Sequence, residues 1–123
     1  MKLSIIVPVY RSQNIVPLLV TRVNAVANSL QMHDSFELIL VNDASPDGSW
    51  EVIKEQAREF PFVKGISLTK NFGQHNAVMA GLAACSGEII VIMDDDLQHP
   101  PRVDPRNGRI YRGRRRRLLY KIS

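Results

Sequence analysis

The chain has 123 residues, of which 45% are hydrophobic and 23% charged, and its formal net charge is +4. This length and composition are ordinary for a single soluble globular domain with a real hydrophobic core. The single Cys85 excludes an internal disulfide, and no apolar stretch approaches the length of a membrane span. The first apolar run is too short for a secretory signal peptide, so we expect a cytoplasmic protein that reaches the inner face of a membrane only through partners.

The first elements in the sequence are a strand and a helix. Leu3–Val9 is a β-branched run without a polar face, which indicates a strand buried on both sides of a parallel sheet. A helix should follow, with Asn14 as its cap and Pro17 in its first turn. Its apolar face is predicted to consist of Ile15, Leu19, Val23, Val26 and Leu30.

The strand–helix alternation continues to residue 93. Further strands are predicted at Phe36–Val41, Phe62–Leu68 and Glu88–Met93. Between them lie an amphipathic helix marked by Trp50, Ile53, Ala57 and Phe60 and capped by Asp47, and a helix of small apolar residues at Gln74–Cys85. Four strands separated by three helices predict an α/β fold, a doubly wound, mostly parallel sheet with helices on both faces.

Three adjacent carboxylates, Asp94, Asp95 and Asp96, follow the last of these strands. In an extended backbone Asp94 and Asp96 project to the same side and Asp95 to the other. Such a pair suits Mg²⁺ or Mn²⁺, which commonly bridge protein carboxylates to the phosphates of a substrate. The alternative is a solvated acidic turn that closes the strand.

Ligands of doubly wound sheets bind beyond the carboxyl ends of the strands. All four predicted strands end in polar or special residues, at Pro8-Val9-Tyr10, Asn42–Ser45, Thr69–Gly73 and Asp94–Asp96. Asp43 ends a hydrophobic strand, where it would either accept from a ligand N–H or cap the Ser45–Gly48 turn. We therefore expect a binding site at this edge of the sheet.

The last 22 residues differ in charge from the rest. Residues 1–101 contain seven basic and eleven acidic residues, a net charge of −4, whereas residues 102–123 contain nine basic and one acidic residue, a net charge of +8. Pro105 and Asn107-Gly108 interrupt this arginine-rich tail, so we expect it to fit neither the sheet nor its covering helices. It is either a solvated extension or a basic arm for an acidic partner, and without interleaved aromatic residues nucleic acid is not favoured.

The segments Pro8-Val9-Tyr10, Asn42–Ser49, Lys70–Ala77 and Asp94–Pro101 together resemble the nucleotide-binding half of family 2 glycosyltransferases of the GT-A fold. Their order and spacing match across residues 3–101, and the resemblance is closest to the enzymes that transfer sugars to dolichol phosphate or undecaprenyl phosphate. It stops after Pro101, where family members continue with the acceptor side of the catalytic domain. The resemblance thus implies a truncated chain, with a nucleotide-sugar-binding part at residues 1–101 and a basic tail at 102–123.

The resemblance also implies roles for individual residues. It places Pro8, Val9 and Tyr10 with Asp43 in the base and ribose pocket, and Lys70 and Gly73 near the diphosphate. Asp94 would face the nucleotide, Asp95 would face the nucleotide side or the sheet, and Asp94, Asp96 and Gln98 would surround Mg²⁺ or Mn²⁺. From the residues alone, Tyr10 could equally pack at the sheet edge, Gly73 could be a loop glycine and Lys70 a solvated lysine. No general base can be assigned.

The function implied is metal-dependent transfer of a sugar from a UDP- or GDP-sugar to an acceptor, with a polyprenyl phosphate favoured. The first alternative is a catalytically silent nucleotide-sugar-binding module or a homo-oligomeric remnant. A nucleic-acid-binding protein led by Arg114–Arg117 is a second alternative, and a phospho-acceptor or hydrolase domain of similar topology is a third.

Overall fold

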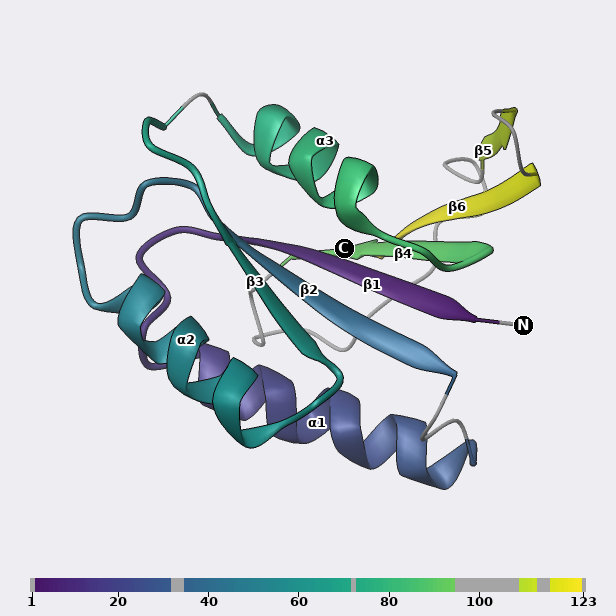
Figure 1. Ribbon diagram of the computed structural model, residues 1–123, viewed down its shortest axis with the longest axis horizontal. Helices are drawn as coiled ribbons and strands as arrows, with labels where there is room; N and C mark the ends of the chain where they lie inside the picture. Colours follow the sequence, from purple (N-terminus) through teal and green to yellow (C-terminus); the bar gives the residue numbers. More distant parts are fainter. Residues whose placement is uncertain (1, 32–34, 72, 95–108, 113–115, 123) are drawn as a thin grey trace.

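The computed structural model describes residues 2–31, 35–71, 73–94, 109–112 and 116–122, the last two ranges as backbone alone. Within these residues one sheet has the strand order β3-β2-β1-β4-β6-β5 (Figure 1). Its strands are β1 (Leu3–Val9), β2 (Phe36–Asn42), β3 (Val63–Ser67), β4 (Ile89–Met93), β5 (Arg109–Arg112) and β6 (Arg116–Ile122), and the helices are α1 (Val16–Ser29), α2 (Ser49–Glu59) and α3 (Gln74–Ala84). Strands β1 to β4 are all parallel to their neighbours, so the predicted doubly wound α/β fold is confirmed.

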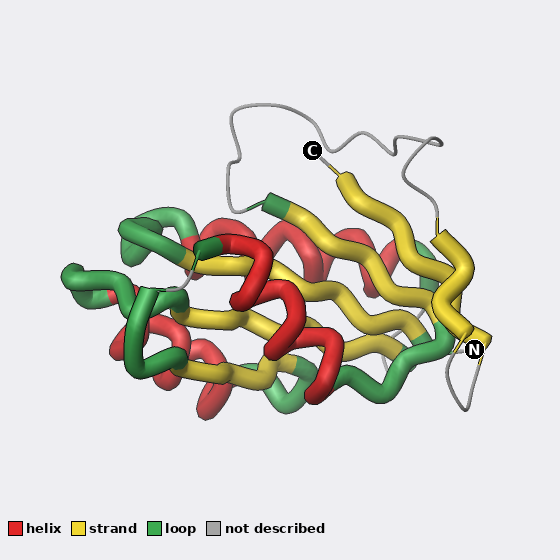
Figure 2. The backbone as a smooth tube through the Cα atoms, turned by 90° about the horizontal axis from the view of Figure 1, so that it is seen from above, coloured by secondary structure: helices red, strands yellow, loops and turns green. Residues whose placement is uncertain are grey.

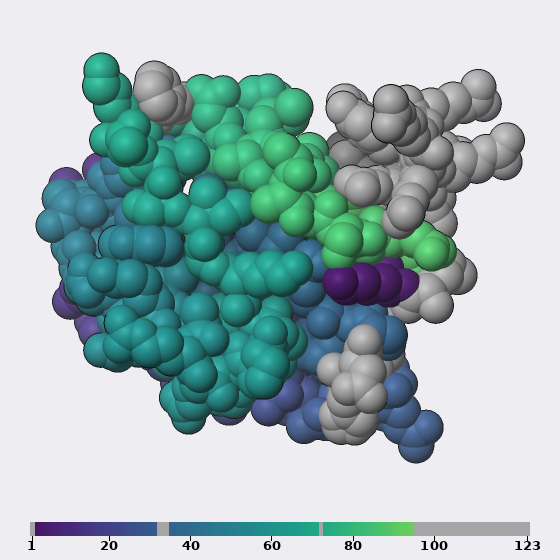
Figure 3. Space-filling model, in the orientation of Figure 1, coloured from purple at the N-terminus to yellow at the C-terminus, as the bar shows by residue number. Residues whose placement is uncertain are grey.

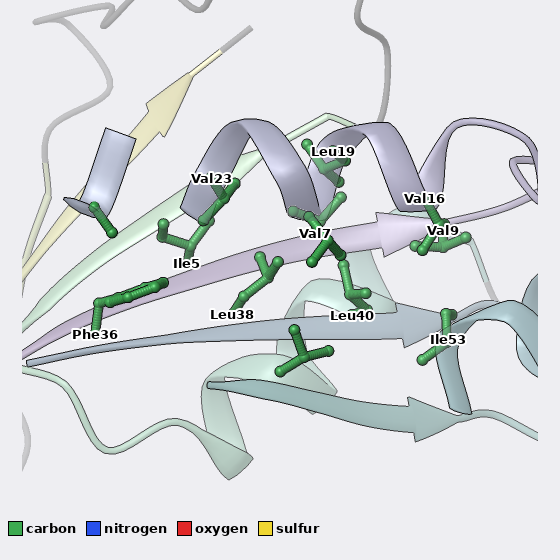
Figure 4. Close-up of a cluster of buried hydrophobic side chains, with 13 residues drawn as sticks. Ile5, Val7, Val9, Val16, Leu19, Val23, Phe36, Leu38, Leu40 and Ile53 are labelled. Carbon is green, nitrogen blue, oxygen red and sulfur yellow. The ribbon is translucent and has the colours of Figure 1, made fainter. Parts of the chain in front are cut away.

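Helices cover both faces of the sheet because alternate side chains of its strands point to opposite sides (Figures 1 and 2). Ile5, Val7 and Val9 of β1 belong to the core cluster under α1 and α2, which Figure 4 shows in close-up. Ile6 of the same strand packs in the second cluster with Ala77 of α3. In the space-filling view, α2 and the edge strand β3 form the lower left of the surface and α3 runs along the top (Figure 3).

Helix α1 corrects two details of the sequence prediction. The residue that precedes it is Ile15, and no side chain at that position caps the helix, so Asn14 is not the cap. Val26 and Leu30 are exposed to 58% and 61%, so they do not belong to the buried face. The buried face instead consists of Val16, Leu19, Val20, Val23 and Ala27. Apolar residues are so frequent in this helix that its sequence is compatible with more than one apolar face, and packing against the sheet selects one.

The tail also differs from its prediction. Strand β6 pairs in parallel with β4, from Ile89 opposite Leu118 to Met93 opposite Ile122, and β5 pairs antiparallel with β6. The expectation that the tail fits no part of the sheet is therefore wrong for these two segments. The physical reason is the short apolar run Leu118–Tyr120 with Ile122, which has strand propensity and meets the edge of β4 that β1 leaves free.

Candidate functional site

A cleft of about 460 Å³ lies at the carboxyl edge of the sheet. The loops that follow β1, β2 and β3 gather at this edge, at the left of Figure 1. The ends of all four predicted parallel strands or the loops that follow them contribute to the wall of the cleft, which is lined by Pro8, Val9, Tyr10, Asp43, Asn71, Gly73, Gln74 and Asp94. The predicted convergence of the strand-end motifs is thus visible in the fold, and this is where parallel α/β sheets commonly bind ligands.

Asp43 is the most unusual residue of this cleft. It follows β2 directly, and its N–H donates to the carbonyl oxygen of Val9 at 3.0 Å, which holds it beside the end of β1. Only 4% of the residue is exposed, yet its Oδ1 atom has no hydrogen-bond partner in the described part of the chain. A buried carboxylate oxygen without a donor costs free energy unless a ligand satisfies it.

The turn after β2 is held by other side chains. Asn42 Oδ1 accepts the N–H of Ser45 at 3.2 Å, and Asp47 Oδ1 accepts the hydroxyl of Ser45 at 2.5 Å and the N–H of Ser49 at 3.0 Å. The cap residue of α2 is Gly48, one position after the predicted Asp47, but Asp47 still accepts the N–H of Ser49, the first residue of the helix. With these bonds in place, the turn needs no bond from the side chain of Asp43.

Tyr10 and Gly73 form two further parts of the wall. Tyr10 is 41% exposed and lines the cleft, so it is not buried in packing at the sheet edge, and the Arg11 guanidinium lies over its ring at 5.6 Å from the centroid. Gly73 precedes α3 with φ +96°, a conformation that side chains rarely adopt, and its N–H donates to Asn71 Oδ1 at 2.9 Å. The first turn of α3 thereby faces the cleft with its N-terminal end, where backbone N–H groups favour anions.

Asp94 is the member of the acidic motif that the structure describes. Its Oδ1 atom accepts a hydrogen bond from Gln74 Nε2 at 2.8 Å, which ties the end of β4 to the start of α3 across the cleft. Asp95, Asp96 and Gln98 lie outside the described residues. Within the described ranges, no group of three His, Cys, Asp or Glu side chains is arranged to hold a metal ion.

The structure therefore brings together six of the predicted nucleotide-binding residues, namely Pro8, Val9, Tyr10, Asp43, Gly73 and Asp94. Lys70 is exposed and does not line the cleft. Sequence reasoning gave no role to Asn71 or Gln74, which do line it. Both lie inside the Lys70–Ala77 motif, so the motif itself was the signal that could have found them.

A doubly wound sheet with a polar cleft at its carboxyl edge is the arrangement in which α/β proteins commonly bind nucleotides. Residues 4–106 match the family model described as "Glycosyl transferase family 2". The match covers most of the chain, and the protein belongs to this family.

Two similar proteins are named as undecaprenyl-phosphate transferases of a modified arabinose. The chain is 39% identical over 104 residues to undecaprenyl-phosphate 4-deoxy-4-formamido-L-arabinose transferase of Aeromonas hydrophila, and 43% identical over 103 residues to that of Shewanella sediminis. These alignments cover 84% and 83% of this chain but 31% and 30% of the relatives. The chain thus spans about a third of their length.

Solved structures show the same fold. A mannosyltransferase from Pyrobaculum calidifontis, in complex with GDP-Man and Mn²⁺, superposes with a TM-score of 0.66 at 25% identity, over 77% of this chain and 27% of that one. TarS of S. aureus superposes with a TM-score of 0.64 at 27% identity, over 85% of this chain and 29% of its own. In the part of this chain that the structure describes, no helix is long and apolar enough to cross a membrane.

Proposed function

We propose that this chain binds a nucleoside-diphosphate sugar in the cleft and serves its transfer to a polyprenyl phosphate. The observation that carries the proposal is the unpartnered, buried Oδ1 of Asp43 in the wall of the cleft. A carboxylate in that position can accept an N–H of uracil or guanine, while the partly exposed Tyr10 offers the ring face away from Arg11 for a base to stack on. Membership of the family and the GDP-Man bound by the P. calidifontis mannosyltransferase support this assignment.

The diphosphate would lie between Gly73 at the start of α3 and the acidic motif after β4. Asp94, Asp96 and Gln98 supply oxygen atoms only, a donor set that fits Mg²⁺ or Mn²⁺, and these residues would hold the ion. The P. calidifontis mannosyltransferase was solved with Mn²⁺. The bound ion would stabilise the negative charge that develops on the leaving diphosphate. Asp95 would face the nucleotide, and Lys70, outside the cleft wall, would act on the diphosphate only at longer range.

In the proposed transfer, a bond forms between an acceptor oxygen and the anomeric carbon of the sugar. The bond from that carbon to the diphosphate breaks, and its electron pair leaves with the nucleoside diphosphate. A lipid phosphate is mostly ionised near neutrality, because the second pKa of a phosphate monoester is about 6. A general base is then unnecessary. The 39–43% identity to undecaprenyl-phosphate transferases favours this acceptor.

We also propose that the nucleotide part of the chain comprises residues 1–101 and that the tail, residues 102–123, is separate from it in function. The described residues that line the cleft all lie between positions 8 and 94. Strands β5 and β6 extend the sheet beyond β4, on the side away from β1.

The decisive experiment is calorimetric titration of the chain with UDP, GDP and CDP, each in Mn²⁺ and in EDTA. We expect binding of UDP or GDP that strengthens with Mn²⁺. Asp96→Ala should weaken binding in Mn²⁺ by about tenfold or more, because it removes a ligand and a negative charge, and should have little effect in EDTA. Glu88→Ala is the matched control, since Glu88 is an exposed acid beside the opposite end of β4.

Three outcomes would count against parts of this proposal. If no nucleotide binds in either condition, the proposed function is wrong. Equal loss with Asp96→Ala in Mn²⁺ and in EDTA would make Asp96 a structural turn residue. Binding without release of nucleoside diphosphate from a sugar donor and a polyprenyl phosphate would favour a silent nucleotide-sugar-binding module.

A further inference from the structure

The β1–α1 and β2–α2 loops, which contribute Tyr10 and Asp43 to the cleft, are joined by three hydrogen bonds from backbone N–H groups to side chains. The N–H of Arg11 donates to Ser45 Oγ at 2.8 Å, and the N–H of Ser12 donates to Ser49 Oγ at 3.0 Å. In the opposite direction, the N–H of Gly48 donates to Gln13 Oε1 at 2.6 Å. The partners are 34 to 37 residues apart in sequence, so these bonds fix the tertiary arrangement of the two loops.

Asp47 connects two of these three bonds. Its Oδ1 accepts the hydroxyl hydrogen of Ser45, whose oxygen in turn accepts from Arg11, and it accepts the backbone N–H of Ser49, whose hydroxyl oxygen accepts from Ser12. A single oxygen of Asp47 therefore holds both Ser45 and Ser49, the two residues whose hydroxyl oxygens accept hydrogen bonds from the β1–α1 loop. Chains of hydrogen bonds of this kind polarise and strengthen one another.

The joined loops hold two residues in an unfavourable backbone conformation. Arg11 has φ 52° and Ala44 has φ 53°, and each directly follows a cleft residue, Tyr10 or Asp43. Left-handed backbone costs a non-glycine residue about 1–2 kcal/mol, and it persists where surrounding contacts enforce it. The two strained residues thus set the directions in which the chain leaves Tyr10 and Asp43.

The ionisation of Asp47 matches this role. Burial raises its pKa, but the hydrogen bonds from Ser45 and Ser49 outweigh that effect and lower the pKa from 3.8 to about 2. The carboxylate therefore remains a pure acceptor near neutral pH, able to hold both donors at once.

We propose that Asp47 is a positioning residue of the cleft, which acts through Ser45 and Ser49 to hold Tyr10 and Asp43 in the arrangement that reads a nucleotide base. This inference rests on the proposed nucleotide site. It differs from simple capping of α2, because a cap would stabilise the helix without influencing which base the cleft prefers.

The test compares Asp47→Ala with Asp47→Asn and Glu51→Ala by titration with UDP, GDP and CDP in EDTA, with urea unfolding on the same samples. Asp47→Ala should weaken binding of the preferred nucleotide by about tenfold, the equivalent of one or two hydrogen bonds, and reduce its preference over CDP. Asp47→Asn retains an acceptor oxygen and should stay within about threefold of the wild type.

Glu51→Ala is the matched control, because Glu51 is also an acid in the first turn of α2 but pairs with Lys54 on the surface. It should leave binding unchanged. Ser45→Ala breaks the bond to Arg11 without removing the carboxylate, and combining it with Asp47→Ala should cost less than the sum of the two single losses.

The outcomes distinguish a failure of the proposed nucleotide-binding function from a failure of the inference about Asp47. If the wild type binds no nucleotide, the proposed function fails. If the wild type binds but Asp47→Ala lowers only the stability, with unchanged base preference in the folded fraction, Asp47 is a cap and the inference is overturned. Should Asp47→Ala not fold, additive losses for Ser45→Ala and Ser49→Ala, or an unchanged base preference in either, would overturn it equally.

Discussion

Strand β2 has a buried carboxylate near each of its ends, and the two differ in the partners that surround them. Glu37, near the amino end, has a side chain only 3% exposed, with Lys2 Nζ at 3.3 Å and Lys64 Nζ at 3.5 Å from its oxygens. The Ser86 hydroxyl also donates to Glu37 at 2.9 Å. Asp43, just beyond the carboxyl end, is equally buried, but its Oδ1 has no partner in the described part of the chain.

This difference distinguishes a structural carboxylate from a candidate binding group. At the amino end the fold supplies two cations and a hydroxyl, so the contacts of Glu37 contribute to stability. At the carboxyl end one oxygen of the buried Asp43, Oδ1, has no partner in the described part of the chain, which is common where a site is preorganised for a ligand. The comparison predicts that changes at the amino end alter stability alone and that changes at the carboxyl end alter binding.

The largest expected effect is on stability and comes from Gly87→Ala. Gly87 precedes β4 and lies beside Ser4 of β1, at the same edge of the sheet as Glu37. A Cβ atom there would lie 2.7 Å from the backbone nitrogen of Ser4 and 2.9 Å from the carbonyl oxygen of Lys2. Because neither atom can move without distorting β1, Gly87→Ala should lower the free energy of unfolding by about 3 kcal/mol. Nucleotide affinity of the folded fraction should not change. Urea unfolding and titration on one preparation measure both quantities.

Gly73 provides the contrasting substitution at the cleft. No atom lies within 4 Å of a Cβ built on Gly73, so Gly73→Ala costs only the strain of φ +96°. We expect a loss of about 1–2 kcal/mol. A larger destabilisation from Gly73→Ala than from Gly87→Ala would contradict this account of the two ends.

The second prediction concerns Asp43→Asn, which preserves the shape of the side chain and turns one acceptor into a donor. It should reduce binding of the preferred nucleotide by about 1–3 kcal/mol and largely abolish discrimination against CDP. Stability should stay the same or rise, because the substitution removes a buried negative charge. Retained base preference would show that Asp43 does not read the base.

Most of the fold could be predicted from the sequence because its physical causes are local. The β-branched runs and the intervening helical patterns located four strands and three helices, with the stated bounds within one residue of those observed. The buried face of α1 and the pairing of β6 could not be obtained in this way. Both depend on which surface the rest of the fold leaves free, and the arginines of the tail obscured its short apolar run.

The site was predictable to a similar extent. Residues that directly follow strands, such as Asp43 and Asp94, could be located because strand ends can be read from hydrophobic runs. Gln74 could not, since its bond to Asp94 spans 20 residues and depends on where α3 starts. The cross-loop partners of Ser45 and Ser49 are more distant still, and only the role of Asp47 at the start of α2, which is local, could be predicted.

The smallest expected effect is the pH dependence contributed by Glu37. Burial raises its pKa, but the hydrogen bond from Ser86 and the charges of Lys64 and Lys2 outweigh burial, so the pKa in the folded protein is lower than the usual 4.5. A carboxyl with a lowered folded-state pKa stabilises the protein above its unfolded-state pKa, and this contribution is lost as the pH falls through the folded-state value. Glu37→Gln cannot titrate and should show no such loss.

The urea midpoint of the wild type should therefore fall more than that of Glu37→Gln between about pH 5 and about pH 3. Asp47 also titrates with a lowered pKa, but it does so in both proteins, so the difference between the two pH profiles isolates Glu37. Glu55→Gln, at an exposed position on α2, controls for the general loss of negative charge. Parallel profiles for the wild type and Glu37→Gln would mean that the lysines and Ser86 do not stabilise the ionised form. The contrast between the two ends of β2 would then reduce to the unpartnered oxygen of Asp43.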